Sequence, residues 1–378
     1  MDYASWIRSM IDRLSREPRD ALALFDSAVP EPKALVQELV SEAFREPLTS
    51  RYASAFIGGN PYTVAALARR YDVAREAIIC TTGATEGLHT VYRALLEPGD
   101  HVLVETPRFE LFDSLASANH LQVSHFSRLA PRFTLDLEAL ENALTPKTRM
   151  IVISDLHNPS SHPVPEAQLD ALARLAEAKG LWVVVDEVYR DYGPLRNRTS
   201  ISAKRSERLI TISSLTKIYG LSTLRCGWII ASGEALRTLR HYNDHYAFGV
   251  SKLGHAMAAL VLERSDRFDA YVQGLSVAAR PVMDHHLGRW RDAGWVEGER
   301  PEHGCVAFLK LSDIEDTHAF SDWLMAHNNV IVAPGELFGQ AGHVRLGFMQ
   351  DPAQLEDALT RFGEGLELYR ETRLRKVV

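Results

Sequence analysis

Short apolar runs alternate with stretches of helical periodicity through the middle of this 378-residue chain. The alternation is typical of βαβ units, in which each strand is followed by a helix that crosses back over the sheet. We therefore predict an α/β fold with a mostly parallel sheet between helices. The runs that indicate strands are HVLVE (101–105), RMIVISD (149–155), LWVVVDE (181–187), RLITIS (208–213) and GWIIAS (227–232).

The segment before the first of these runs indicates a helix. In TTGATEGLHTVYRALLEPGD (81–100), apolar residues recur at helical spacing as far as Leu95, and Pro98-Gly99 supplies the stop. We expect this helix to begin close to Gly83.

The pattern changes after about residue 275, where a long helix, AARPVMDHHLGRWRDAG, is followed by strand-like GCVAFLKL and HVRLGFM. This order suits a smaller α+β domain. A chain of this length also exceeds the size at which one core usually stops growing. We predict an N-terminal arm with part of the small domain at 1–45, a large domain at 46–275 and a small C-terminal domain at 276–378.

Charge and cysteine content narrow the possible partners. The net charge of -7 gives no electrostatic reason to bind nucleic acid or anionic lipid. The three cysteines are far apart and in no CxxC spacing, so neither a disulfide framework nor a zinc or other metal site is expected. Residues 1–20 indicate an amphipathic helix instead of a signal peptide, and no run approaches the ~18 apolar residues of a membrane span. These features predict a cytoplasmic protein.

The stretch TTGAT (81–85) indicates an anion site. A glycine-containing turn that leads into a helix leaves backbone N–H groups pointing outward at the positive end of the helix dipole. Phosphate is the expected guest, and Gly83, Ala84 and Thr85 are the candidate residues. A plain helix cap gives the same pattern, so this alternative stays open here.

The stretch LWVVVDEVYRDY (181–192) contains a strand that is apolar on both faces, and Asp186 falls at its carboxyl end. Open parallel sheets bind their ligands at that end. A buried carboxylate there is costly unless it meets a cation. A satisfied aspartate at a loop start is one alternative. An ATPase strand that holds Mg²⁺ is another, but no lysine in the chain follows a glycine, so the required GxxxxGK[ST] loop is missing.

A single lysine, Lys217, lies in SSLTKIYGLSTLRCGW (213–228). Lysine becomes a covalent catalyst when it condenses with an aldehyde, and pyridoxal 5′-phosphate (PLP) is the cofactor that uses this reaction. Such a site requires an amine, a buried carboxylate and a phosphate cradle. Lys217, Asp186 and the turn at 83–85 meet these three requirements.

The residues around this lysine add phosphate donors. Ser214 and Thr216 contribute hydroxyls, and Arg225 has the planar fork that suits phosphate. Taken singly, Lys217 and Arg225 could be surface residues. The set as a whole favours PLP binding.

The order and spacing of these residues resemble the class I/II aminotransferases of PLP fold type I, from about Tyr52 to Phe348. The family pattern S-x-[ST]-K, followed eight residues later by arginine and then glycine, appears here as SLTK (214–217) with Arg225 and Gly227. The resemblance implies a large PLP-binding domain with a mostly parallel, seven-stranded-type sheet and a smaller α+β domain.

The resemblance also implies roles for single residues. Lys217 would form the internal aldimine and shuttle the proton, and Asp186 would pair with the pyridine nitrogen. Tyr189 of DEVY and Asn158 of HNPSS would contact the phenolate oxygen of the cofactor. Phe109 of TPRFELF would stack on the ring, although it could also be a core residue.

Two further residues are carried over by the resemblance. Arg345 of HVRLGF would hold the substrate α-carboxylate, with Asn158 as a second substrate contact; a bidentate pair of this kind orients the Cα–H bond. Tyr52 would reach the phosphate of a neighbouring subunit, which implies a homodimer with shared active sites. A plain packing role for Tyr52 stays open.

The chain departs from the family pattern in two places. The usual N-P-[TS]-G reads NPSS (158–161), so the glycine is missing and the form of this turn is in question. The N-terminal segment ALFDSAVPEP (23–32) lacks the common glycine-containing substrate-gate loop. Substrate specificity cannot be taken from that loop.

The predicted activity is transfer of an amino group between an L-amino acid and a 2-oxo acid, a reaction of amino acid metabolism. One alternative is another PLP enzyme of this fold acting at Cα or Cβ, such as a β-lyase or a capreomycidine-synthase-like cyclase. A regulator that uses this fold as an effector sensor is a third interpretation. Such regulators carry an added DNA-binding domain, for which this chain has neither the length nor a basic patch.

Overall fold

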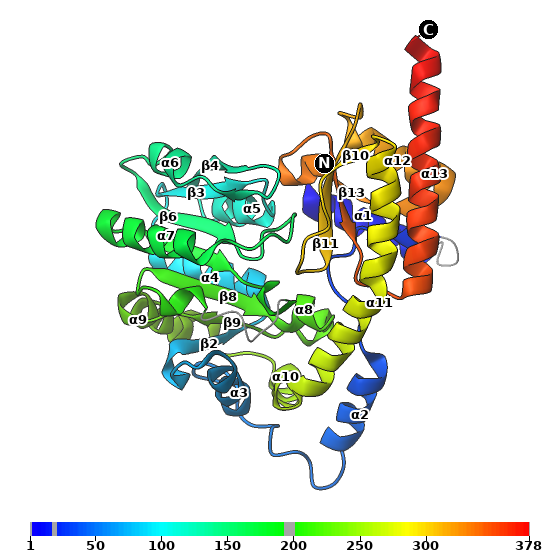
Figure 1. The fold of residues 1–378 in the computed structure, drawn as a ribbon. Helices are drawn as coiled ribbons and strands as arrows, with labels where there is room; N and C mark the ends of the chain where they lie inside the picture. Colours follow the sequence, from blue (N-terminus) through cyan, green and yellow to red (C-terminus); the bar gives the residue numbers. More distant parts are fainter. Residues whose placement is uncertain (1, 17–20, 193–200, 378) are drawn as a thin grey trace.

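The computed structural model describes residues 2–16, 21–192 and 201–377. Its largest element is an eight-stranded sheet with the strand order β2-β9-β8-β7-β6-β3-β4-β5 (Figure 1). In this spatial order the strands are β2 (Ile78–Thr81), β9 (Gly227–Ile230), β8 (Leu209–Ser214), β7 (Trp182–Asp186), β6 (Thr148–Ser154), β3 (His101–Thr106), β4 (Gln122–Leu129) and β5 (Thr134–Leu135).

The five strands from β8 to β4 run parallel, whereas β9 is antiparallel to both of its neighbours and β5 is antiparallel to β4. The expectation of a mostly parallel sheet is therefore confirmed. The sheet has one strand more than the seven-stranded type, because the two-residue β5 pairs with the end of β4 at the edge.

Helices cover both faces of this sheet, which explains the unbroken apolar runs. Val184 of β7 packs in the core under α4, α5 and α9, while Val183 and Val185 face the opposite core under α6 and α7. The covering helices are α4 (Ala84–Leu95), α5 (Leu111–Ala118), α9 (Gly233–Tyr242), α6 (Leu137–Asn142) and α7 (Glu166–Lys179).

A second, four-stranded antiparallel sheet lies beside the first (Figure 1). Its strands in order are β10 (Val296–Glu297), β11 (Val306–Leu311), β14 (His343–Gly347) and β13 (Ala333–Pro334). The elements that accompany it are α12 (Thr317–Asn328), β12 (Val330–Ile331) and α13 (Pro352–Val377).

One long helix, α11 (Ser265–Asp292), runs through residue 275, where the sequence pattern changes. The change therefore falls inside a helix, and the proposed domain limits near 275 divide that helix. Before it lies α10 (Lys252–Glu263), which packs against α2 (Lys33–Ala43) and α3 (Pro61–Tyr71). The short helix α8 (Leu215–Ile218) follows β8.

The N-terminal segment belongs with the four-stranded sheet. Its helix α1 (Tyr3–Arg16) buries Tyr3, Trp6 and Met10 in a cluster with Phe308 of β11. The strand β1 (Leu22–Ala23) pairs in parallel with β12. The predicted amphipathic helix is therefore confirmed, and its apolar face is covered by residues from the C-terminal third of the chain.

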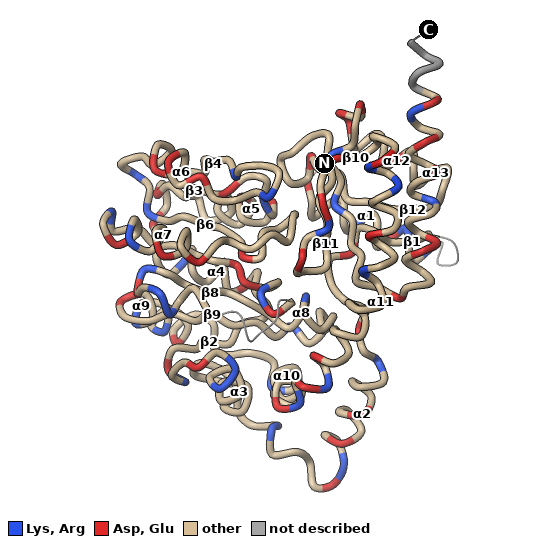
Figure 2. Tube along the Cα trace, in the orientation of Figure 1, with Lys and Arg blue, Asp and Glu red and all other residues tan. Residues whose placement is uncertain are grey.

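Acidic and basic residues are interspersed along the described chain (Figure 2). Among the helices of the described ranges, none is both long and apolar enough to cross a membrane. The cytoplasmic location stays a prediction.

Candidate active site

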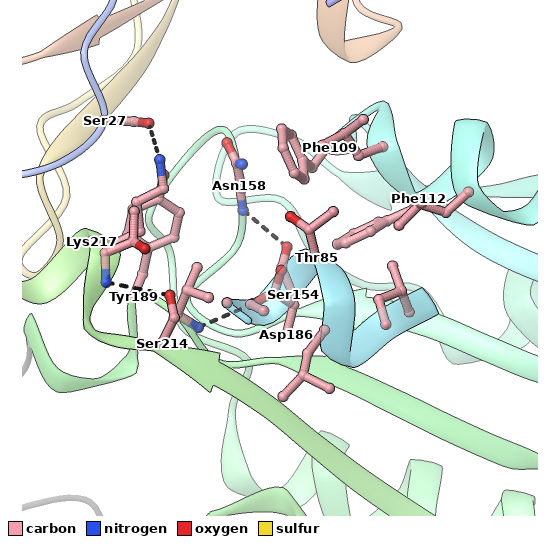
Figure 3. A pocket seen from close by; sticks show the side chains of 18 of the residues that line it. Ser27, Thr85, Phe109, Phe112, Ser154, Asn158, Asp186, Tyr189, Ser214 and Lys217 are labelled. Carbon is pink, nitrogen blue, oxygen red and sulfur yellow. Dashed lines mark hydrogen bonds between the residues drawn. The ribbon is translucent and has the colours of Figure 1, made fainter. Parts of the chain in front are cut away.

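A cavity of about 820 Å³, counting the space at its open mouth, lies at the carboxyl ends of the parallel strands. Its lining comes from the segments that follow the strands of the eight-stranded sheet and from the N-terminal segment, which contributes Ser27 (Figure 3). Of the predicted site residues, the following line it: Gly83, Ala84, Thr85, Phe109, Asn158, Asp186, Tyr189, Ser214, Thr216, Lys217 and Arg225.

Lys217 reaches the cavity from the first turn of α8, directly after β8. Ser214 caps this helix by accepting a hydrogen bond from the Thr216 backbone N–H (3.4 Å). The Lys217 Nζ atom donates to the Ser27 hydroxyl (2.9 Å) and lies 6.0 Å from the centroid of the Tyr189 ring. The cap and the short helix thus fix the amine inside the cavity.

The electrostatics of the lysine follow from its neighbours. Burial lowers the pKa of Lys217, but the phenol oxygens of Tyr189 and Tyr3 and the carboxylate of Asp26 outweigh burial and raise it above its ordinary value. The lysine is therefore a protonated donor to Ser27 in this state.

Asp186 lies at the end of β7 and faces the cavity without an ion-pair partner among the described residues. Its Oδ1 atom accepts a hydrogen bond from the Val188 backbone N–H (3.1 Å), and burial raises its pKa to about 7. A cationic group in the cavity would stabilise the ionised form of this carboxylate. The protonated ring nitrogen of PLP is such a group, so the residues present fit this cofactor.

The anion cradle depends on two glycines. Gly83, which precedes α4, has φ +89°, and a Cβ atom there would lie 2.8 Å from Nη2 of Arg225. A Cβ atom on Gly227 would overlap the carbonyl carbon of Gly83. The Nη2 atom of Arg225 donates to the Thr82 carbonyl (3.0 Å). The glycines therefore allow β9 and Arg225 to approach the N-terminal turn of α4, whose first N–H groups lack partners within the helix.

Arg345 lies behind the cavity on β14 and has no exposed surface. Its Nη1 atom donates to Oδ1 of Asn158 (3.0 Å) and its Nη2 atom to the Phe25 carbonyl (3.1 Å). Its Nε atom has no hydrogen-bond partner, and no Asp or Glu among the described residues forms an ion pair with it. A buried charge without a counterion is costly, so this position favours an anionic ligand.

The turn that lacks the family glycine has Ser161 at that position. Ser161 adopts φ +59°, a left-handed conformation that glycine adopts more readily. A Cβ atom on Gly304 would overlap the Ser161 hydroxyl, so glycine at 304 gives the serine its space. Asn158 still reaches the cavity, and its backbone N–H donates to the Ser154 hydroxyl (3.0 Å).

Tyr52 does not line the cavity of its own chain. Its side chain is 37% exposed, and the Lys252 Nζ atom lies 4.1 Å from the centroid of its ring. This position is compatible with either alternative left open by the sequence.

Several cavity residues were missed by the sequence reasoning, and two of these, Tyr3 and Ser27, come from the N-terminal segment. The helical periodicity of residues 1–20 predicted that one face of this helix is apolar. It could not predict where that face packs, because its position depends on the pairing of β1 with β12 across more than three hundred residues. The other missed lining residues are Leu88, Leu111, Phe112, Leu115, Ser154, Val188 and Ile212.

A lysine, a buried carboxylate and a phosphate cradle at the carboxyl edge of this sheet define a PLP-dependent enzyme of fold type I. The model of the family "Aminotransferase class I and II" matches residues 50–362. The chain therefore belongs to the class I and II aminotransferases, and it is a PLP-dependent aminotransferase.

Individual relatives are similar to this chain along most of its length. An aspartate aminotransferase of Streptomyces avermitilis is 25% identical over 88% of this chain and 85% of its own length. The capreomycidine synthase of Streptomyces vinaceus is 29% identical over 82% and 80%. The solved structure of the Thermus thermophilus aspartate aminotransferase with maleate has a TM-score of 0.84 at 23% identity, with 97% of each chain covered, and this likeness shows the fold.

The close approach of β9 to the cradle predicts the effect of a Gly227→Ala substitution. The added methyl group would overlap the Gly83 backbone and force the two segments apart, which costs about 1–3 kcal/mol for an overpacked site. Urea unfolding should show this loss. Gly274→Ala in α11 is the matched control, because its new Cβ atom meets nothing within 4 Å. Equal stability of the Gly227→Ala variant and the wild type would contradict the proposed close approach.

Proposed function

We propose that this aminotransferase moves an amino group between an L-amino acid and a 2-oxo acid in the cavity at the carboxyl edge of the eight-stranded sheet. The observation that carries the proposal is Arg345, a fully buried cation whose hydrogen bonds go only to neutral oxygens, next to a cavity that contains Lys217 and Asp186. Both classes of substrate share an α-carboxylate, which this cation would bind.

In this proposal the cofactor is held at both ends. Asp186 would pair with the ring nitrogen, and this ion pair would stabilise the charged form of a carboxylate whose pKa burial has raised. Ser214, Thr216 and Arg225 would bind the phosphate together with the first turn of α4 at 83–85.

Three further residues orient the ring. Tyr189 and Asn158 contact its phenolate oxygen, and both side chains face the cavity. Phe109 stacks on the ring face. Its own ring is held edge-on against Phe112, with centroids 5.9 Å apart and an interplanar angle of 86°.

PLP supplies an electron-withdrawing ring that makes the α-hydrogen of a bound amino acid acidic. Arg345 and Asn158 hold the α-carboxylate and so fix the direction of the Cα–H bond. Lys217 would hold and move the proton at Cα, because its amine lies in the cavity.

Transamination predicts a stoichiometric half-reaction. An L-amino acid added to the holoenzyme without any oxo acid should convert the absorbance of bound PLP to that of pyridoxamine phosphate, and an oxo acid should restore it. The two reactions together should give ping-pong kinetics. A Lys217→Ala variant should lose the conversion, since it lacks the base.

The same measurement tests the alternative activity. A β-lyase or a cyclase would release ammonia or a cyclised product while the absorbance of bound PLP stays unchanged. That result would move the assignment to other chemistry at Cα or Cβ. If the half-reaction occurs, a scan of amino donors against pyruvate and 2-oxoglutarate would identify the substrates.

We also propose that the protein is a homodimer with shared active sites, formed through an exposed apolar surface. Segments 40–57 and 246–253 contribute this surface, and they meet where the Val250 backbone N–H donates to the Ala55 carbonyl (3.2 Å). Apolar patches of this kind on soluble proteins usually mark interfaces. The exposed residues are Val40, Phe44, Leu48, Tyr52, Phe56, Ile57, Tyr246, Phe248 and Leu253.

A second copy is the occupant that best explains this surface. Tyr52 belongs to it, lies outside the cavity of its own chain and would reach the phosphate of the partner, as the resemblance implies. A two-fold interface places the same surface of each chain opposite the other. Figure 1 shows the segment after α2 as an extended loop at the edge of the molecule, where a partner can reach it.

Charges introduced into this surface should dissociate the dimer. Phe56 is 64% and Ile57 81% exposed, so the double variant Phe56→Asp/Ile57→Asp should fold, sediment as a monomer and lose most of its activity. Val277→Asp on α11, where the valine is 68% exposed, is the matched control and should remain dimeric. A wild-type protein that sediments as a fully active monomer would refute the shared site.

A further inference from the structure

Tyr3, the first residue of α1, is buried at the wall of the cavity and is 8% exposed. Its ring meets the Phe109 ring edge-on, with centroids 5.3 Å apart and an interplanar angle of 83°. The Phe338 ring contacts it from another side at 6.0 Å. Aromatic contacts on two sides fix the direction of the phenol group.

The hydroxyl group of Tyr3 lies next to the proposed carboxylate site. The Arg345 Nη2 atom donates to the phenol oxygen (3.3 Å), which therefore acts as an acceptor in this contact. A phenol also has one proton to donate, and no acceptor for it is found among the described residues. An anion bound by Arg345 at this point can accept that proton as a second hydrogen bond.

The charges around Tyr3 strengthen it as a donor. Burial raises the pKa of Tyr3, but the guanidinium of Arg345 and the ammonium of Lys217 outweigh burial and lower it below its ordinary value. A more acidic hydroxyl forms a stronger hydrogen bond to a carboxylate.

Tyr3 also connects the two sides of the cavity. Its backbone N–H donates to the carboxylate of Glu110, which precedes α5 on the eight-stranded sheet. The rest of α1 packs in a cluster that contains Phe308 of β11, and Trp6 also meets the ring of Phe25, which follows β1, at 5.6 Å. A ligand that binds Tyr3 and Arg345 together would therefore hold α1 in place over the cavity.

We propose that Tyr3 is a substrate-binding residue, whose hydroxyl donates a hydrogen bond to the α-carboxylate held by Arg345. The inference rests on the proposed function, because it takes Arg345 as the carboxylate site. Because every amino acid and 2-oxo acid has an α-carboxylate, this contact from α1 would form with every substrate of the enzyme. It also means that a bound substrate would hold α1 against the cavity.

The test measures binding of propionate to the holoenzyme by calorimetry, since propionate has the carboxylate but neither the amine nor the oxo group. In Tyr3→Phe, the ring contacts remain and only the hydroxyl is lost. The dissociation constant should rise roughly ten- to a hundred-fold in a variant that still folds, as for a hydrogen bond to a charged group. Tyr271→Phe is the matched control, because it removes a hydroxyl that bonds the Pro30 carbonyl (3.0 Å) outside the cavity.

Hydrogen exchange provides a second measurement that a purely structural role would not change. Saturating propionate should slow exchange of the α1 amides in the wild type but much less in Tyr3→Phe. An unchanged propionate affinity in Tyr3→Phe would overturn the assignment of Tyr3. So would a wild type that binds no propionate.

The outcomes separate this inference from the proposed function. If the wild type fails the transamination half-reaction but binds propionate more tightly than Tyr3→Phe, the reaction is wrong and the role of Tyr3 stands. If the half-reaction occurs and both proteins bind propionate equally, the reaction stands and the role of Tyr3 is wrong.

Discussion

The arrangement of this site depends on one buried cation. Arg345 has no exposed surface and no acidic partner among the described residues, so the folded protein keeps a full positive charge that only neutral oxygens solvate. Such a charge costs stability, and the cost is recovered when an anion binds. Lys217 and Asp186, two ionisable groups that line the adjacent cavity, likewise lack ion-pair partners among the described residues.

Three parts of the fold combine to enclose this charge. The eight-stranded sheet presents Asp186 and Asn158 at its carboxyl edge, and β14 of the smaller sheet carries Arg345 to the same point. The N-terminal segment closes the remaining side, with Tyr3 over the guanidinium and Ser27 against the lysine. The site is thus a junction of segments far apart in the sequence, as expected for ligand sites in open α/β sheets.

Local patterns in the sequence predicted five of the eight strands of the large sheet, its mostly parallel order, the cradle at 83–85, Asp186 and Lys217. The family resemblance added Phe109, Asn158 and Tyr189 of the cavity. The unbroken apolar run before Asp186 and the motif around Lys217 are short-range signals that tertiary contacts did not override. Tyr3 and the compensation of Ser161 by Gly304 could not be predicted, because each depends on the approach of segments more than a hundred residues apart. The role proposed for Tyr52 requires a second chain, whose position cannot be derived from the sequence of one chain.

Substitution of Arg345 by methionine tests the central claim most directly. If Arg345 serves to bind a ligand, an apolar side chain of similar length should leave the stability in urea equal or higher. The substitution removes an uncompensated buried charge. The same variant should lose about 2–5 kcal/mol of binding free energy for propionate and for every amino acid substrate. A strongly destabilised Arg345→Met protein that still binds propionate with wild-type affinity would show that the arginine supports the fold and would contradict the account.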